Sequence, residues 1–430
     1  MPDKLTFKER IYLIIFLIFV TTFELYHVII DTNPPMLFRA AYTMIYLLFA
    51  VMSPSLIPTY TAVNLIIERF SSSFGEFLPN TMLFHIVVIL YGILASRAYN
   101  KPQIRSYDKR PFRLFLFLYF YGVVSLLLHV NVKPQFSFVI DGLFMMLYLY
   151  ALSLSKTKYV KPILLWSVSV MSIVCMIGLF NYDNLVGEYA TSLGDVDRLE
   201  WKDANYFSFF IGIILMFTLY LARYTKSKIY KRYLICSALL MLVTMVSLIS
   251  RGAIVALVIS LLYYFRKDIF SFRSLGYAFA VAVFLLALYY AGMMDGLIMR
   301  FMSEDVQTGS GRTDIWQTGL QTFFSKDIMT IIFGAGEGQA IKMTYINGQY
   351  WSPHNNYLSM MYNYGIIGLL IFCMWMISLF FHSRTRESRG VVLFIAINSF
   401  TIVPFTYVSA LWFMVPLIMV WDKRIYGRLQ

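Results

Sequence analysis

The stretch that decides the fold is residues 233–265, YLICSALLMLVTMVSLISRGAIVALVISLLYYF. It contains two apolar runs, 233–249 and 253–265, with hardly any loop between them. A helix of roughly 20 apolar residues is long enough to cross a hydrocarbon core of about 30 Å. The stretch therefore predicts two membrane-crossing helices joined by a sharp turn at Ser250-Arg251-Gly252.

Apolar runs of this kind recur along the whole chain of 430 residues, of which 59% are hydrophobic and 14% are charged. So few charged residues cannot cover soluble domains of this size in water. We therefore expect an all-α polytopic integral membrane protein with about 12 to 14 transmembrane helices. The remaining runs lie at 11–30, 37–52, 81–97, 114–130, 137–154, 162–180, 207–222, 275–292, 365–381, 390–405 and 407–421.

The stretch Ser53–Phe70 decides how many spans precede residue 100. Pro54 and Pro58 make it irregular, because proline interrupts the hydrogen bonds of a regular helix. It is either a fourth, short span, or one of the three runs before residue 100 is not a full crossing.

The charged residues indicate which loops face the cytoplasm. The net charge is +13, but the basic residues are divided among short loops and form no single stripe of the kind that binds nucleic acid. Cytoplasmic loops are enriched in lysine and arginine. Two long segments without this enrichment, Asn181–Tyr206 and Gly292–Pro353, are therefore expected to face outward. The basic, cytoplasmic segments are 101–113, 156–161, 223–232, 266–273, 384–389 and 423–428.

This topology divides the chain into five segments: N-terminal transmembrane helices (1–180), a first outer loop (181–206), central helices with the Ser-Arg-Gly turn (207–292), a large outer loop (293–355), and C-terminal helices with a cytoplasmic tail (356–430).

Arg251 is expected at or slightly below the outer membrane surface. An arginine at the centre of a membrane helix costs about 3 kcal/mol, so it needs a partner, a water-filled cavity or a route by which it reaches the interface. The first outer loop ends with Asp197-Arg198-Leu-Glu-Trp-Lys-Asp203-Ala-Asn205 and enters a helix directly. Arg198 can pair with a neighbouring carboxylate there, and either Asp203 or Asn205 can cap the helix.

The large outer loop carries Gly311-Arg312-Thr-Asp-Ile-Trp316, then Phe333-Gly-Ala-Gly-Glu-Gly338, then Ser352-Pro-His354-Asn355-Asn356-Tyr357. The apolar spacing from Asp314 to Phe324 predicts an amphipathic helix along the membrane surface, with Arg312 at its start. The glycines allow either a close backbone approach to a ligand or a simple turn.

His354 precedes a helix, so it is either a cap or surface residue or the base of an active site on the outer side. No second histidine or cysteine lies nearby in the sequence, so we expect no zinc site. Asp197, Asp203 and Asp314 leave a metal-assisted reaction as the alternative, although each can equally balance an arginine.

Together these residues resemble the O-antigen polymerase and O-antigen ligase superfamily of bacterial cell-envelope glycosyltransferases. The resemblance runs from Arg198 to Gly368, roughly the C-terminal half. It is carried by Arg198 with Asn205, Ser250-Arg251-Gly252, Gly311-Arg312 with Trp316, Gly334-Ala-Gly-Glu-Gly338, His354-Asn355 with Tyr357-Leu358, and Gly365-Ile-Ile-Gly368.

The resemblance implies a metal-independent transfer, without a cofactor, of a glycan from a polyprenyl diphosphate such as undecaprenyl diphosphate to a sugar hydroxyl. The reaction takes place on the periplasmic side of the bacterial inner membrane. In this assignment His354 is the catalytic base, and Arg251, Arg312 and Arg198 bind the diphosphate. Four residues support them or contact the sugar: Asn355, Tyr357, Trp316 and Asn205.

Within the superfamily, the outer-loop segments resemble a polymerase of O-antigen or a related surface polysaccharide more than a ligase that moves the glycan to the lipid A core of lipopolysaccharide. A chain-length regulator and a flippase are the partners that the resemblance implies. A transporter is the third alternative, suggested by Glu24, His27 and Asp141.

Overall fold

The computed structural model describes residues 5–29, 36–68, 81–99, 109–129, 137–154, 157–181, 186–191, 194–199, 203–266, 282–283, 285–292, 294–302, 312–346, 348–383, 385–407 and 411–424. These residues form a bundle of apolar helices with two short hairpins. The prediction of an all-α polytopic membrane protein is confirmed.

The elements lie close to the predicted spans. They are α1 (Phe7–Ile29), α2 (Met36–Met52), η1 (Pro54–Leu56), α3 (Ile57–Glu68), α4 (Thr81–Tyr99), α5 (Lys109–Leu128), α6 (Ser137–Leu154), α7 (Thr157–Phe180), β1 (Val186–Thr191), β2 (Gly194–Leu199), α9 (Ala204–Tyr224), α10 (Lys228–Ser247), α11 (Arg251–Phe265), α13 (Asp295–Met302), α14 (Arg312–Phe324), α15 (Ile328–Phe333), η3 (Ala340–Met343), β3 (Tyr345–Ile346), β4 (Gln349–Tyr350), α16 (Asn356–His382), α17 (Arg386–Asn398), α18 (Pro404–Tyr407) and α19 (Leu411–Arg424).

Five helices among the described residues are long and apolar enough to cross a membrane: α5, α7 over residues 163–180, α9, α10 and α16. Shorter apolar helices cover residues 82–95, 138–154, 251–265 and 411–420. Of the predicted span 275–292, the structure describes residues 282–283 and 285–292, and the rest lies outside the described residues. The total number of spans therefore stays a prediction.

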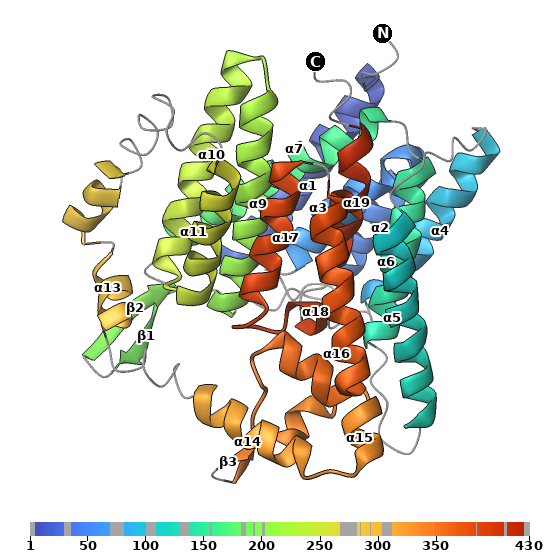
Figure 1. Cartoon of the computed structure of the whole chain (residues 1–430). Coiled ribbons are helices and arrows are strands. Elements are labelled where there is room, and N and C mark those ends of the chain that lie inside the picture. Colours follow the sequence, from blue (N-terminus) through green and yellow to red (C-terminus); the bar gives the residue numbers. More distant parts are fainter. Residues whose placement is uncertain are drawn as a thin grey trace.

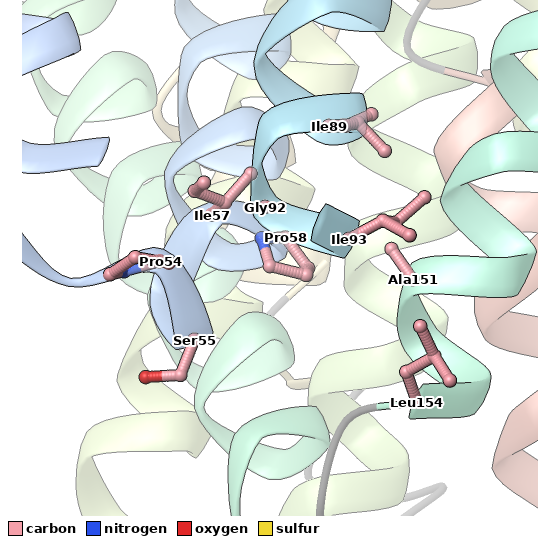
Figure 2. A pocket seen from close by; sticks show the side chains of 9 residues that line it. All are labelled: Pro54, Ser55, Ile57, Pro58, Ile89, Gly92, Ile93, Ala151 and Leu154. Atoms are coloured by element: carbon pink, nitrogen blue, oxygen red, sulfur yellow. The ribbon is translucent and has the colours of Figure 1, made fainter. Parts of the chain in front are cut away.

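The irregular stretch at Pro54 is a sharp bend. Residues 40–52 of α2 and residues 54–66 of η1 and α3 meet at 110°, so they form a broken span or a re-entrant loop. Proline is tolerated here because Pro54 and Pro58 stand in the first turns of η1 and α3, where a backbone N–H has no partner within the helix. A small cavity beside the bend is lined by side chains of η1, α3, α4 and α6, apolar except for Ser55 (Figure 2).

The predicted span 390–405 is wrong in its end point. Helix α17 stops at Asn398, and a separate short helix, α18, begins at Pro404. The hydroxyl of Thr401 donates to the backbone oxygen of Asn398, which closes the turn after α17. Pro404 has no N–H to continue a helix ladder, so the chain breaks here before α19.

The molecule has two distinct ends (Figure 1). Helices α14 and α15 and strand β3 gather at the end opposite the labelled N- and C-termini. We call the end that carries α14, α15 and β3 the outer end, because the loop charges predict that it faces away from the cytoplasm. Helix α9 lies inside the bundle with almost all of its side chains buried, which agrees with its nearly unbroken apolar sequence.

Both outer loops contain a hairpin that the predicted all-helical pattern omits. In the first, β1 and β2 pair antiparallel from Val186↔Leu199 to Thr191↔Gly194. In the second, β3 and β4 flank Asn347-Gly348, and Gly348 has φ of +83°. An Asn-Gly pair is a strong signal for a two-residue hairpin turn, because both positions tolerate positive φ.

Candidate active site

His354 lies at the outer end of α16 and is half-buried. Its φ is +45°, a left-handed conformation that costs a non-glycine residue free energy. The next residue, Asn355, caps α16, because its side-chain oxygen accepts from the backbone N–H groups of Tyr357 at 2.9 Å and Leu358 at 3.1 Å. The N–H of Asn356 donates to the Ser399 backbone oxygen at 2.7 Å. His354 therefore precedes the cap, and the capping role belongs to Asn355.

Two charged side chains act on His354. Burial lowers the pKa of His354 below its ordinary value, and the positive charge of Arg312 lowers it further. The carboxylate of Asp203 acts in the opposite direction. Burial and Arg312 therefore favour the neutral form of the imidazole, which is the form that can accept a proton, and Asp203 opposes them.

Helix α14 connects Arg312 to the backbone beside His354. Arg312 is its first residue, and Trp316 lies one turn further on the same face. The indole N–H of Trp316 donates to the backbone oxygen of Pro353 at 2.7 Å. Helix α14 therefore presents a cation and a hydrogen-bond donor to the segment that carries His354.

The buried side of α14 packs on the protein. Ile315, Gly319 and Phe323 are buried, and the Phe323 ring lies 5.5 Å from that of Tyr362 in α16. The predicted helix at 314–324 is confirmed, with its start at Arg312. The expectation that its apolar face lies on the membrane surface does not hold for these residues, because they contact α16 and its neighbours.

Removing the indole donor tests the link between α14 and His354. We expect Trp316→Phe to lower the rate of the transfer that the resemblance implies about fivefold, because the ring remains while a hydrogen bond worth roughly 1 kcal/mol is lost. Steady-state transfer assays measure this change. Trp166→Phe is the matched control, since that half-buried indole lies in α7, outside this contact. Equal rates for the two variants would contradict a positioning role for Trp316.

The Ser-Arg-Gly turn is fastened to the start of α9. The Ser250 hydroxyl donates to the side-chain oxygen of Asn205 at 3.1 Å. Asp203 caps α9, accepting from the N–H groups of Asn205 at 2.9 Å and Tyr206 at 3.4 Å. The helix cap is thus Asp203, whereas Asn205 bridges α9 to the turn.

Arg251 is the half-buried first residue of α11. It directly follows Ser250, which is hydrogen-bonded to α9 through Asn205. Gly252 follows it, and a Cβ there would come within 2.4 Å of the Thr401 hydroxyl oxygen. The turn therefore needs glycine for close packing. Ile249, with φ of +49°, makes the reversal between α10 and α11.

Of the two remaining candidates, Tyr357 and Arg198, the structure describes the side chain of Tyr357. The Tyr357 hydroxyl donates to the backbone oxygen of Ala396 at 2.9 Å, so this side chain joins α16 to α17. Arg198 stands in β2 opposite Gly187, but its side chain lies outside the described residues.

The glycine-rich segment Phe333–Gly338, which we call the glycine strap, follows the backbone of α16. Gly334, Gly336 and Gly338 all have positive φ. The N–H groups of Ala335 and Gly336 donate to the backbone oxygens of Tyr362 and Asn363, each at 3.0 Å. The close backbone approach that the glycines permit is thus an approach to the protein's own helix.

Glu337 of the strap is a buried carboxylate that sequence reasoning did not single out. Its Oε1 accepts from the N–H of Phe138, in the first turn of α6, at 2.7 Å. A negative charge is favourable at a helix start. The only available signal in the sequence was a single charged residue among three glycines. A charged side chain is seldom buried without a partner.

No group of three histidine, cysteine, aspartate or glutamate side chains is arranged to hold a metal ion among the described residues. Asp203 caps α9, Asp314 is exposed in the first turn of α14, and the side chain of Asp197 lies outside the described residues. Metal independence stays a prediction.

Among the residues that suggested a transporter, the structure describes only the side chain of Asp141, so that alternative stays a prediction. Asp141 is buried in the first half of α6. The side chains of Glu24 and His27 lie outside the described residues.

Residues 236–373 match a family model described as O-antigen ligase, which covers about a third of the chain. The match begins in α10 and ends in α16, so it includes Arg251, Arg312, Trp316 and His354. No curated protein and no solved structure matches the chain.

Proposed function

We propose that this multi-pass membrane protein is an O-antigen or related surface-polysaccharide polymerase, a proposal supported by the match of residues 236–373 to a family model described as O-antigen ligase. It would transfer a glycan from a polyprenyl diphosphate to the terminal sugar hydroxyl of another lipid-linked repeat unit. The observation that carries the proposal is the hydrogen bond from Trp316 to Pro353, which joins the helix that begins at Arg312 to the segment that carries His354.

The proposed reaction is a displacement at the anomeric carbon of the donor glycan. The acceptor hydroxyl oxygen forms the new bond while the bond to the diphosphate oxygen breaks. His354 takes the proton of the hydroxyl, and the polyprenyl diphosphate leaves with the bonding electron pair. Arginine suits this leaving group because its planar guanidinium stays charged and binds two oxygens at once.

The three arginines have different roles in this proposal. Arg312 is proposed to bind the diphosphate and also to influence the base, because its charge lowers the pKa of the His354 imidazole. Arg251 approaches from the start of α11, where the positive end of the helix dipole also favours an anion. Arg198 of β2 is proposed as a third diphosphate contact.

A ligase is the second candidate, because the matching family model is described as O-antigen ligase. The two activities differ in the acceptor, which is a lipid-linked repeat unit for the polymerase and the lipid A core for the ligase. A deletion strain separates them. Loss of a polymerase leaves core capped with one repeat unit, whereas loss of a ligase leaves bare core and polymer on its lipid carrier.

Purified protein given a lipid-linked repeat unit tests the reaction directly. We expect polymerisation by the wild-type protein, and a loss of about 10²- to 10³-fold for Arg312→Gln, the usual cost of removing one group that stabilises developing charge. The polymerisation rate of Arg251→Gln should fall as well. Lys342→Gln, an exposed cation of the same outer loop, is the control.

Arg312→Gln should also move the pH profile. Arg312 lowers the pKa of His354, so its removal raises that pKa, and the neutral imidazole is then lost at a higher pH as the solution is acidified. Polymerisation that survives both arginine changes would overturn the diphosphate assignment.

A further inference from the structure

The hairpin Thr344–Trp351, which we call the tyrosine hairpin, exposes a pair of aromatic rings at the outer end. Tyr345 and Tyr350 face each other across β3 and β4, with ring centroids 4.8 Å apart. Their side chains are 56% and 57% exposed. Side chains of directly paired residues project from the same face of a hairpin. The two rings therefore lie side by side, tilted 53° to each other, and both are open to the surroundings.

This hairpin is fixed to the candidate active site. The N–H of Trp351 donates to the Thr344 backbone oxygen at 2.9 Å, which extends the strand pairing beyond Tyr350. The buried Thr344 hydroxyl donates to the backbone oxygen of Ile315 in α14, at 3.5 Å. The chain then reaches Pro353, which accepts from Trp316, and His354 follows. The rings thus hold a set position relative to Arg312 and His354.

The chemistry of the hairpin suits a sugar. Residues 344–353, TYINGQYWSP, contain no charged side chain but include two amides and three aromatic rings. Aromatic rings with polar groups beside them offer both an apolar face and hydrogen-bonding atoms, and a pyranose ring likewise has an apolar C–H face and a polar rim. Loops that bind anionic bilayers are instead rich in lysine and arginine.

We propose that Tyr345 and Tyr350 form a binding platform for the glycan of the lipid-linked substrate, where sugar units that extend beyond His354 stack on the two rings. This inference rests on the proposed function, because that function supplies a glycan at the neighbouring base. Strand β3 lies at the tip of the outer end, away from the helix bundle (Figure 1), which leaves room for a chain that grows outward.

Binding of the free repeat-unit oligosaccharide, without its lipid, tests the platform separately from catalysis. We expect saturable binding to the full-length protein in detergent, and a dissociation constant about tenfold higher for Tyr345→Ala combined with Tyr350→Ala. The double change to phenylalanine keeps both rings and should bind within about twofold of the wild type. Phe324→Ala is the matched control, because its ring is 55% exposed at the end of α14.

The outcomes are distinct. No saturable binding by the wild type, or equal dissociation constants for the wild type and the double alanine variant, overturns the platform. Quenching of Trp351 fluorescence by brominated lipids in nanodiscs, judged by comparison with Trp351→Phe, would show the hairpin on the bilayer and also overturn it. If the protein binds the oligosaccharide but never transfers it from polyprenyl diphosphate, the proposed function fails while the platform stands.

Discussion

Replacing His354 with glutamine is expected to lower the rate of glycan transfer about 10²- to 10⁴-fold, the range that a positioned general base contributes. Glutamine keeps a polar side chain of similar length but cannot take the proton of the acceptor hydroxyl. The left-handed backbone at His354 is held by its neighbours, through the cap at Asn355 and the hydrogen bond from Trp316 to Pro353. The variant should therefore fold normally and still bind the lipid-linked donor.

The pH dependence of the wild-type protein belongs to the same prediction. A base must be neutral to accept a proton, and burial together with Arg312 lowers the pKa of His354. Activity should thus persist as the pH falls through the usual histidine value of about 6.5 and decline only below it. Transfer rates across a pH series measure this decline. His382→Gln, at the opposite end of α16, is the control. An acidic limb that is unchanged by Arg312→Gln would show that the titrating group is not His354.

Replacing Gly365 with alanine is expected to be the most damaging change to the fold at the outer end. Gly365 has φ of +70° inside α16, and a Cβ there would lie 2.1 Å from the backbone oxygen of Ile332. A backbone oxygen cannot move aside as a flexible side chain can. We expect the free energy of unfolding to fall by about 3 kcal/mol or more, because the strained dihedral and the steric clash add together.

Gly348→Ala separates the two contributions to that loss. Gly348 also has a positive φ, of +83°, but a Cβ added to it meets nothing within 4 Å. It should therefore show the cost of the dihedral alone, about 1 kcal/mol. Thermal unfolding of both variants in detergent measures the difference. Similar losses for the two glycines would mean that the contact between the glycine strap and α16 contributes little to stability.

Much of this architecture could be predicted from the sequence because each helix is encoded locally. The runs 37–52 and 137–154 match α2 and α6 almost residue for residue, since hydrophobic length and capping residues lie within the element itself. The break between Asn398 and Pro404 was missed, because the apolar pattern continues across it and the turn depends on a side-chain hydrogen bond from Thr401.

The connections of the candidate site could not be predicted from the sequence. Arg312 and His354 were recognised as candidates, and the structure joins α14, which begins at Arg312, to the segment before His354, while the roles of both residues stay predictions. The bond from Trp316 to Pro353 and the link from Glu337 to Phe138 join residues far apart in the chain. No local pattern specifies such pairs, because they form only when packed helices bring the segments together. The Asn-Gly turn of the tyrosine hairpin was readable locally and was overlooked among the surrounding helices.

The interruption at Gly365 divides α16 into two mechanical units. The helical hydrogen-bond ladder is broken there, and the backbone oxygens of Tyr362 and Asn363 accept instead from the glycine strap. The first nine residues of α16, from Asn356 to Tyr364, are thus tied to the outer loop, while the remainder crosses with the bundle. A substitution in the glycine strap is therefore expected to disturb the first part of α16, which directly follows His354, more than the part after Gly365.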